Sequence, residues 1–178
     1  MNERHYHTKD ISRWAGELRA GDRLLLSGTV YTARDAAHKR ICAMLDRGKR
    51  PPFPLEGSVV YYAGPTPTPP GLPIGSCGPT TSARMDPYTP RLLRLGLKGM
   101  IGKGDRSPEV AGAIRDCGAV YLCAIGGAGA LAAKCVVSVE VVAFADLGCE
   151  SVKKLEVRDF PLVAAIDSVG GNLFEGVK

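Results

Sequence analysis

Apolar residues along this chain change repeatedly between the spacing of helices and the spacing of strands. The pattern predicts helices over 8–20, 33–47, 86–95 and 107–118. It predicts strands over 22–32, 57–63, 98–101, 119–125, 136–144 and 154–167, with glycine- and proline-rich loops at 48–54 and 64–73. Helices that alternate with strands are typical of α/β proteins, so we expect one α/β domain over residues 1–178.

Three local interpretations concern the ends and bends of these elements. Gly28 predicts a bend within the first strand, and Asp86-Pro87 is a favourable N-cap and first-turn pair for the third helix. The polar start of the chain contains His5 and His7. Two isolated histidines there are more typical of a frayed terminus than of a metal site.

Composition and charge narrow the possible partners. With 45% hydrophobic and 23% charged residues, the chain resembles ordinary globular proteins and not disordered ones. Its net charge of +5 suits an anionic small molecule or an acidic protein partner. The basic residues are scattered and lack interleaved aromatic residues, so a nucleic-acid interface is not expected.

The cysteines and the apolar stretches bear on location. Six cysteines occur without a C-x-x-C pair, mostly in apolar segments, which predicts reduced core residues and no zinc or iron–sulfur ligand set. The start has no apolar stretch of the signal-peptide kind, and the longest apolar region is shorter than the roughly 20 residues of a membrane-spanning helix. We therefore expect a cytoplasmic protein without a membrane partner.

Residues 78–86 concentrate candidate binding chemistry. Gly78-Pro79 predicts a turn, and a helix beginning at Thr80 would point its free N–H groups at an anion. Arg84 would then lie one turn beyond Thr80 on the same face. A simpler interpretation stays open, in which the hydroxyl groups only cap a helix.

Two further turns carry cations. Arg34 and His38 lie one turn apart at a strand-to-helix junction, a favoured place for ligand groups in α/β folds. The helix dipole disfavours a cation there, which makes Arg34 informative. Lys103 lies between two glycines that would allow it to approach a ligand. Together with Thr80 and Arg84, these residues predict a site for a compact dianion such as a dicarboxylate.

Two glycine-rich stretches lack the signature of a nucleotide site. The loop around Lys103 does not have the spacing of a P-loop. Residues 126–129 follow a strand, but the spacing of a dinucleotide fingerprint is imperfect and no acidic residue follows at the expected distance. We interpret these glycines as tight backbone packing.

Three motifs together resemble a known family. The motifs are Ala-Arg-Asp-Ala-Ala-His at 33–38, Gly-Pro-Thr-Thr-Ser-Ala-Arg-Met-Asp at 78–86 and Gly-Lys-Gly at 102–104. In this order and separation they resemble the β subunit of class I fumarase and L(+)-tartrate dehydratase, which is equivalent to the C-terminal domain of single-chain class I fumarases. The resemblance covers nearly the whole chain and ends with 126–128 and 166–167.

This resemblance implies a fold, a reaction and a partner. It implies a swivelling β/β/α domain with a mixed central sheet or barrel-like core flanked by helices. The reaction would be the reversible hydration of fumarate to (S)-malate, catalysed only together with an α subunit that binds a [4Fe–4S] cluster, in an α2β2 or related hetero-oligomer. The alternatives are tartrate dehydration to oxaloacetate and a stand-alone dicarboxylate-binding module without catalysis.

The resemblance also implies roles for individual residues. Arg34, Arg84 and Lys103 match carboxylate-binding cations, Thr80 matches a proposed catalytic base, and no residue of this chain would bind metal. His38 would orient Asp35 or touch substrate, or would be a helix-surface residue with a local partner. Ser82-Ala83 and Asp105 depart from the Ala-Gly and Asn of many fumarases, so fumarate and tartrate both stay open. The supporting residues would be Asp35, His38, Gly78 and Thr81.

Overall fold

The computed structural model describes residues 4–124 and 129–175. In these ranges the chain forms seven strands, five α-helices and three 3-10 helices (η). In chain order they are β1 (Arg4–His7), η1 (Thr8–Asp10), α1 (Ile11–Trp14), β2 (Arg23–Thr32), α2 (Asp35–Asp46), β3 (Val59–Tyr61), η2 (Ser82–Met85), α3 (Thr89–Arg94), β4 (Gly99–Gly102), α4 (Pro108–Asp116), β5 (Val120–Ala124), α5 (Gly129–Lys134), β6 (Val136–Ala143), η3 (Ala145–Glu150) and β7 (Val152–Ile166).

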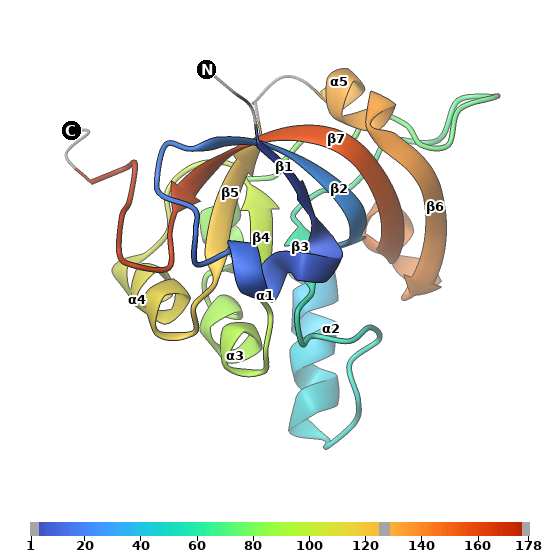
Figure 1. Cartoon of the computed structure of the whole chain (residues 1–178). Coiled ribbons are helices and arrows are strands. Elements are labelled where there is room, and N and C mark those ends of the chain that lie inside the picture. The colour runs from blue at the N-terminus through green and yellow to red at the C-terminus, as the bar shows by residue number, and fades with distance from the viewer. Residues whose placement is uncertain (1–3, 125–128, 176–178) are drawn as a thin grey trace.

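The sheet closes on itself. Its strand order is β1-β2-β3-β4-β5-β7-β6, and an additional antiparallel pairing of β2 with β7 closes a five-stranded barrel of β2, β3, β4, β5 and β7. The four strands from β2 to β5 are parallel to their neighbours, and the long curved β7 arches over them (Figure 1). The predicted α/β fold with a barrel-like core flanked by helices is confirmed.

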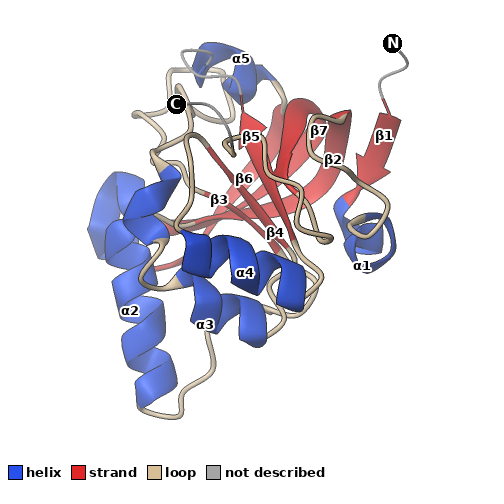
Figure 2. Cartoon of the chain, turned by 90° about the vertical axis from the view of Figure 1, so that its left-hand side faces the viewer, coloured by secondary structure: helices blue, strands red, loops and turns tan. Residues whose placement is uncertain are grey.

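Alternate residues of the barrel strands face two separate hydrophobic layers. Tyr61 faces the barrel interior, where α1 contributes Trp14, while Tyr62 faces the helices. Helices α2, α3 and α4 cover this outer face together, and α1 lies on the opposite side of the sheet (Figure 2). Neighbouring residues therefore differ in environment because side chains alternate along a strand. The outer layer is built mainly from Ile41, Val60, Tyr62, Leu92, Met100, Ile114 and Tyr121.

Gly28 is the predicted bend of the first barrel strand. The pairing of β2 with β7 shifts register between Leu26 and Gly28, and Gly28 has φ +106°. A side chain there would collide with His7 and Thr8, and residues other than glycine rarely adopt this φ. The bend is confirmed, and it makes room for the N-terminal segment against the barrel.

Two predicted elements at the start of the chain differ from the structure. His5 and His7 lie in β1, which pairs in parallel with β2, so the frayed terminus was wrong. The Trp14 indole donates a hydrogen bond of 2.8 Å to the His7 carbonyl and holds this edge strand in place. The helix predicted over 8–20 is shorter and ends at Trp14.

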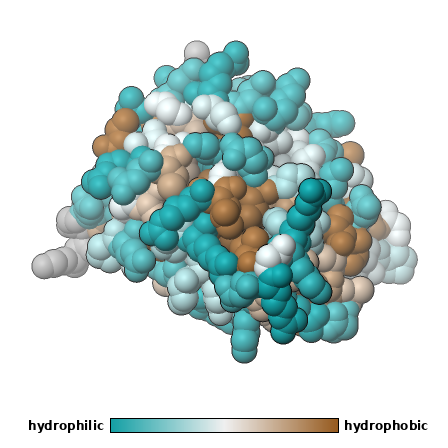
Figure 3. All heavy atoms as spheres, turned by 90° about the horizontal axis from the view of Figure 1, so that it is seen from below, coloured by the Kyte–Doolittle hydropathy of each residue, from teal (hydrophilic) through white to brown (hydrophobic). Residues whose placement is uncertain are grey.

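The face of the molecule that Figure 3 shows is mainly hydrophilic. Seen from the helical end, hydrophilic side chains surround a small hydrophobic patch (Figure 3). All six cysteines are free thiols. Cys77 is buried in the core, and the partly buried Cys117, Cys123 and Cys135 pack against core clusters, whereas the exposed Cys149 departs from the prediction. None of the described helices has the length and hydrophobicity to cross a membrane.

Barrel packing predicts the effect of a core substitution. Leu26 is fully buried in the interior, so Leu26→Ala should lower the free energy of unfolding by about 2–5 kcal/mol. The matched control is Leu72→Ala, whose leucine is 58% exposed and should change this free energy by less than about 0.5 kcal/mol. Urea denaturation measures both, and equal effects would contradict the assigned interior.

Candidate functional site

Three parallel strands deliver polar residues to one edge of the barrel. Arg34 follows β2, Gly64 follows β3 and Lys103 follows β4. These strands are parallel, so their carboxyl ends meet at the same edge. This is the edge at which open α/β sheets usually bind ligands.

The segment that contains Thr80 lies between the ends of β3 and β4. Pro79 forms an antiparallel bridge with Ala63, and the Thr80 N–H donates to the Tyr62 carbonyl at 2.6 Å. On the other side, Thr81 forms a parallel bridge with Lys103. The structure therefore brings the predicted Thr80 and Lys103 segments side by side.

The anion-binding helix end predicted at Thr80 is wrong. The first helical residue is Ser82, and η2 is a single 3-10 turn. The Thr80 N–H is engaged by Tyr62, and the Ser82 N–H donates to the Lys103 carbonyl at 2.9 Å. Backbone pairing to both neighbouring strands outcompetes helix formation here, so chemistry at this edge depends on side chains.

The capping interpretation of the hydroxyl groups is also wrong. Thr81 occupies the N-cap position of η2 but makes no capping hydrogen bond with its side chain. Ser82 is buried, and its Oγ accepts from the Lys103 N–H at 3.1 Å. A side chain at Gly102 would collide with this hydroxyl, which explains a glycine before Lys103.

Arg84 is paired with Asp35 across the site. The Arg84 Nη2 lies 2.8 Å from Asp35 Oδ2, and its Nε donates to Oδ1 at 3.0 Å. This two-point pair ties η2 to the start of α2. The Arg84 side chain is 52% exposed, so the pair contributes less than about 1 kcal/mol to stability. Among the described residues, the Arg84 Nη1 makes no hydrogen bond.

Arg34 reaches from the start of α2 over the end of β3. Its guanidinium passes so close to Gly64 that a side chain there would lie 2.8 Å from Nη1. Its Nε lies 3.7 Å from Glu150 Oε1, too far for a hydrogen bond. Lys153 holds the turn before Glu150, since its Nζ donates to the Ser151 hydroxyl at 2.7 Å and to neighbouring carbonyls.

His38 is not at the surface, and within the described part of the chain it makes no hydrogen bond to Asp35. It is fully buried, and its Nδ1 carries the proton because the Arg34 carbonyl, 2.8 Å away, can only accept. Burial lowers the pKa of His38 to about 4. Among the described residues its Nε2 has no hydrogen-bond partner. His38 therefore supports the backbone at Arg34 as a neutral side chain.

Gly78 is packed against another glycine. A side chain on Gly78 would meet Gly129 Cα at 3.5 Å, and the Cys77 N–H donates to the Gly129 carbonyl at 3.0 Å. Tight backbone packing is thus confirmed for Gly129. Residues 126–128 of the same glycine-rich stretch lie outside the described residues.

The sequence predicted Asp86 as the N-cap of the third helix, and this prediction is wrong. α3 begins later, at Thr89 with Tyr88 as its N-cap residue. The Asp86 carboxylate instead pairs with buried Arg106 at 2.6 Å and accepts from the Ser107 N–H at 2.7 Å. Arg106 was not predicted as a functional residue, because no local pattern in the sequence shows that this loop arginine turns inward.

The described residues show no metal centre of their own. They include no group of three or more His, Cys, Asp or Glu side chains placed to hold a metal ion. Two cavities border the proline-rich loop, the larger of about 500 Å³ against α5. Neither is lined by Thr80, Arg84 or Lys103.

Comparison with known proteins identifies relatives of this chain. Residues 3–177 match the family described as Fumarase C-terminus. The chain is 39% identical to "Fumarate hydratase class I, anaerobic" of Escherichia coli over 95% of this chain and 31% of that protein. It is 44% identical to "Fumarate hydratase 1, mitochondrial" of Leishmania major over 86% of this chain and 28% of that protein. It thus spans less than a third of either enzyme.

A smaller relative matches along most of its length. The chain is 41% identical to "Putative L(+)-tartrate dehydratase subunit beta" of Methanocaldococcus jannaschii. That alignment covers 96% of this chain and 88% of the archaeal protein. The region that this chain has in common with the longer enzymes is therefore also found in a protein that is named as a separate subunit.

The buried His38 predicts a pH dependence of stability. The unfolded chain protonates this histidine below about pH 6.5, whereas the folded chain keeps it neutral down to about 4. The free energy of unfolding should therefore fall by roughly 3 kcal/mol between pH 6.5 and pH 4 from this residue. His38→Asn can keep the hydrogen bond to Arg34 and should flatten the slope in urea denaturation. Identical slopes for the two proteins would contradict this origin.

Proposed function

This chain belongs to the Fumarase C-terminus family, and from that premise we propose that it supplies half of the active site of a hydro-lyase. The substrate is a four-carbon dicarboxylate, and the main reaction is the reversible hydration of fumarate to (S)-malate. One observation carries the proposal: the edge formed by the ends of β2, β3 and β4 collects Arg34, Thr80, Arg84 and Lys103 from three separate motifs.

Arg34, Arg84 and Lys103 bind the substrate carboxylates. Arginine suits this task because its fork of N–H donors matches a carboxylate with two bonds. Asp35 orients Arg84 from behind, as the 2.8 Å contact indicates. Lys103 is exposed on a short loop after β4 and supplies a compact charge. Thr81 and Gly78 support the segment through backbone packing.

Thr80 is the base in the dehydration direction. Its oxygen takes a proton from C3 of malate, the C–H electrons form the double bond, and the C2 hydroxyl leaves as water with a proton from an acid on the partner subunit. A threonine hydroxyl is a weak base, so this step needs a stabilised alkoxide. Since the nearby N–H groups are engaged in backbone pairing, the stabilisation comes from the cations Arg84 and Lys103.

A [4Fe–4S] cluster on an α subunit completes the site. The described residues do not fit a cluster, since they offer no ligand group for a metal ion. When bound to the partner, such a cluster supplies a Lewis acid for the substrate carboxylate and hydroxyl. The residues of this chain bind, orient and move a proton on the other side of the substrate.

The exposure of the site supports a partner that covers it. Thr81, Arg84 and Lys103 are exposed, and Thr80 is only partly buried. Shielding from bulk solvent strengthens the electrostatic contacts with the substrate while the reacting water is still admitted, so the α subunit provides the opposite wall in an α2β2 or related assembly. The six free thiols suit the reducing cytoplasm, where we place the complex.

Tartrate dehydration is the second candidate reaction. The archaeal relative named as a tartrate dehydratase subunit matches along 88% of its length. Tartrate carries a second hydroxyl in place of one hydrogen of malate, so the same cations and base would serve both substrates.

Reconstitution tests the proposed function directly. This chain combined with a cluster-loaded α subunit should convert fumarate to malate, and the loss of fumarate absorbance measures the rate. Each chain alone should be inactive. A parallel assay with L(+)-tartrate identifies the preferred substrate. Hydratase activity of this chain alone without iron would overturn the two-subunit arrangement. Binding of malate to this chain alone by calorimetry, without turnover in any complex, would favour a stand-alone binding module.

Thr80→Ala tests the base. In the reconstituted complex it should lower kcat about 10²- to 10⁴-fold, with a much smaller change in KM, because the cations that bind the carboxylates remain. Thr68→Ala is the matched control, since Thr68 is an exposed residue of the proline-rich loop, and it should leave both constants unchanged. Near-normal turnover of Thr80→Ala would remove this residue from the proton transfer.

A further inference from the structure

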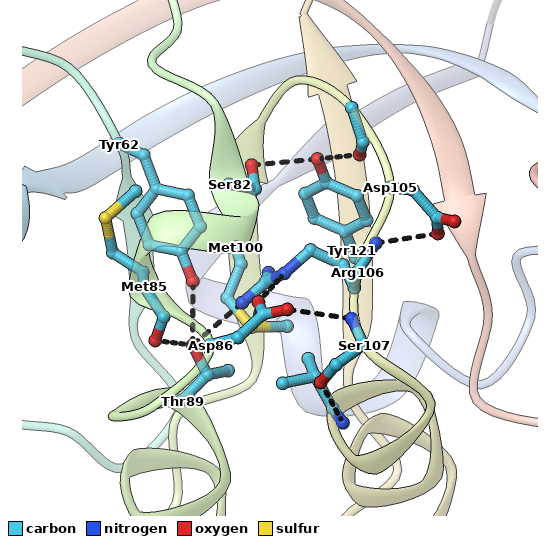
Figure 4. Close-up of polar contacts among 12 residues, drawn as sticks. Tyr62, Ser82, Met85, Asp86, Thr89, Met100, Asp105, Arg106, Ser107 and Tyr121 are labelled. Carbon is cyan, nitrogen blue, oxygen red and sulfur yellow. Dashed lines mark hydrogen bonds and ion pairs between the residues drawn. The ribbon is translucent and has the colours of Figure 1, made fainter.

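Beneath the candidate site, a buried arginine joins the two segments that carry Thr80 and Lys103. The Arg106 side chain is fully buried, and its Nε donates to Asp86 Oδ1 at 2.6 Å. The second oxygen of the same carboxylate accepts from the Ser107 N–H at 2.7 Å (Figure 4). Asp86 follows η2 and Arg106 follows the Lys103 loop, so one ion pair connects the two.

The rest of the guanidinium is held by the layer between barrel and helices. Its Nη2 donates to Thr89 Oγ1 at 2.8 Å, and this hydroxyl donates to the Met85 carbonyl at 2.9 Å. The rings of Tyr62 and Tyr121 flank the cation, with centroids 5.3 and 5.0 Å from Cζ. Arg106 is therefore fixed in direction by α3 on one side and by two barrel strands on the other.

Two hydroxyl groups, those of Tyr121 and Ser82, continue the hydrogen-bond network from Arg106 to the backbone of the site. Tyr121 Oη lies 2.8 Å from both Ser82 Oγ and the Gly104 carbonyl. A hydroxyl has one proton, and the carbonyl can only accept, so Tyr121 donates to Gly104 and accepts from Ser82. Ser82 in turn accepts from the Lys103 N–H. Burial raises the pKa of Tyr121, which keeps this proton in place.

We propose that Arg106 and Asp86 are positioning residues that fix the register between the Thr80–Arg84 segment and the Lys103 loop. The proposal rests on the proposed function, because it concerns the spacing of groups that would contact the same substrate. The Arg106 side chain has no exposed surface, and the two Asp86 oxygens accept from Arg106 and from the Ser107 N–H, so the pair has no direct role in substrate binding. They act through Ser107, Thr89 and the backbone that carries Thr80 and Lys103.

The chemistry of the pair favours a geometric role over a stabilising one. A buried ion pair adds little net stability compared with apolar residues of similar size, because removing two charges from water is costly. Its hydrogen bonds, however, have fixed directions, and an arginine can hold Asp86 and Thr89 at the same time. A lysine offers a single point charge and cannot reproduce this fork.

The test uses a double variant in the reconstituted complex. Arg106→Met with Asp86→Asn removes both charges together, and the asparagine oxygen can still accept from the Ser107 N–H. Its Tm should stay within about 8 °C of the wild type, because no unpaired charge is left buried. Its kcat/KM should nevertheless fall at least tenfold at a temperature well below unfolding. The single variant Arg106→Lys, which keeps the charge but not the fork of donors, should also lose activity relative to the wild type.

Ile114→Ala is the stability-matched control. Ile114 is fully buried on α4 in the same layer but makes no polar contact with the site. It should lower the Tm by at least as much as the double variant and leave kcat and KM near the wild-type values. The positioning role would be overturned if the double variant and Ile114→Ala lost equal activity at equal loss of Tm. Full activity of the double variant would overturn it as well.

Hydrogen exchange separates this inference from the proposed function. The Ser82 N–H donates to the Lys103 carbonyl, and the Lys103 N–H donates to Ser82 Oγ, so both amides connect the two segments. Their hydrogen exchange should accelerate at least tenfold in the double variant but not in Ile114→Ala. If the wild-type complex has no hydro-lyase activity, the proposed function fails while this measurement still decides the positioning. Unchanged exchange at both amides would overturn it.

Discussion

Closure of the barrel by the pairing of β2 with β7 is the constraint on which the other features depend. A closed sheet leaves no free edge at these strands and divides their residues into an inner and an outer set. Hydrophobic layers cover the inner set and much of the outer set, whereas the loops at the strand ends carry polar groups that can face a ligand. At one end, parallel strands deliver Arg34 and Lys103 to a common edge. The site is thus a consequence of the fold's connectivity.

The same constraint explains why the support below the site is polar. The segment from Pro79 to Ser82 lacks a long helix or strand of its own, and it depends on bridges to the ends of β3 and β4. Apolar packing is non-directional and would allow such a segment to slide. The directional contacts of Ser82, Tyr121 and Arg106 remove this freedom.

Sequence patterns identified elements and exposed chemistry better than they identified partners. The motifs around Thr80, Arg84 and Lys103 were found because they are local, and the structure brings them together. Asp86 was misassigned because the capping signal is local, whereas its true partner Arg106 is 20 residues away along the chain. Glu150, which faces Arg34, was missed for the same reason, and Asp35 was named as a supporting residue but not as the partner of Arg84. Charge pairing across a fold leaves no periodic signal.

The carboxylates change the electrostatic picture of the site. Three cations suggest an edge that neutralises a dianion by itself. In the structure Glu150 faces Arg34 and Asp35 binds Arg84, so each arginine already has an opposite charge beside it. Such partners orient a guanidinium and weaken its attraction for a further anion. Within the described residues, the charge of Lys103 is the main surplus at this edge. Under the function proposed above, the remaining attraction for a dicarboxylate would come from the α subunit, and this half-site would hold one end of the substrate.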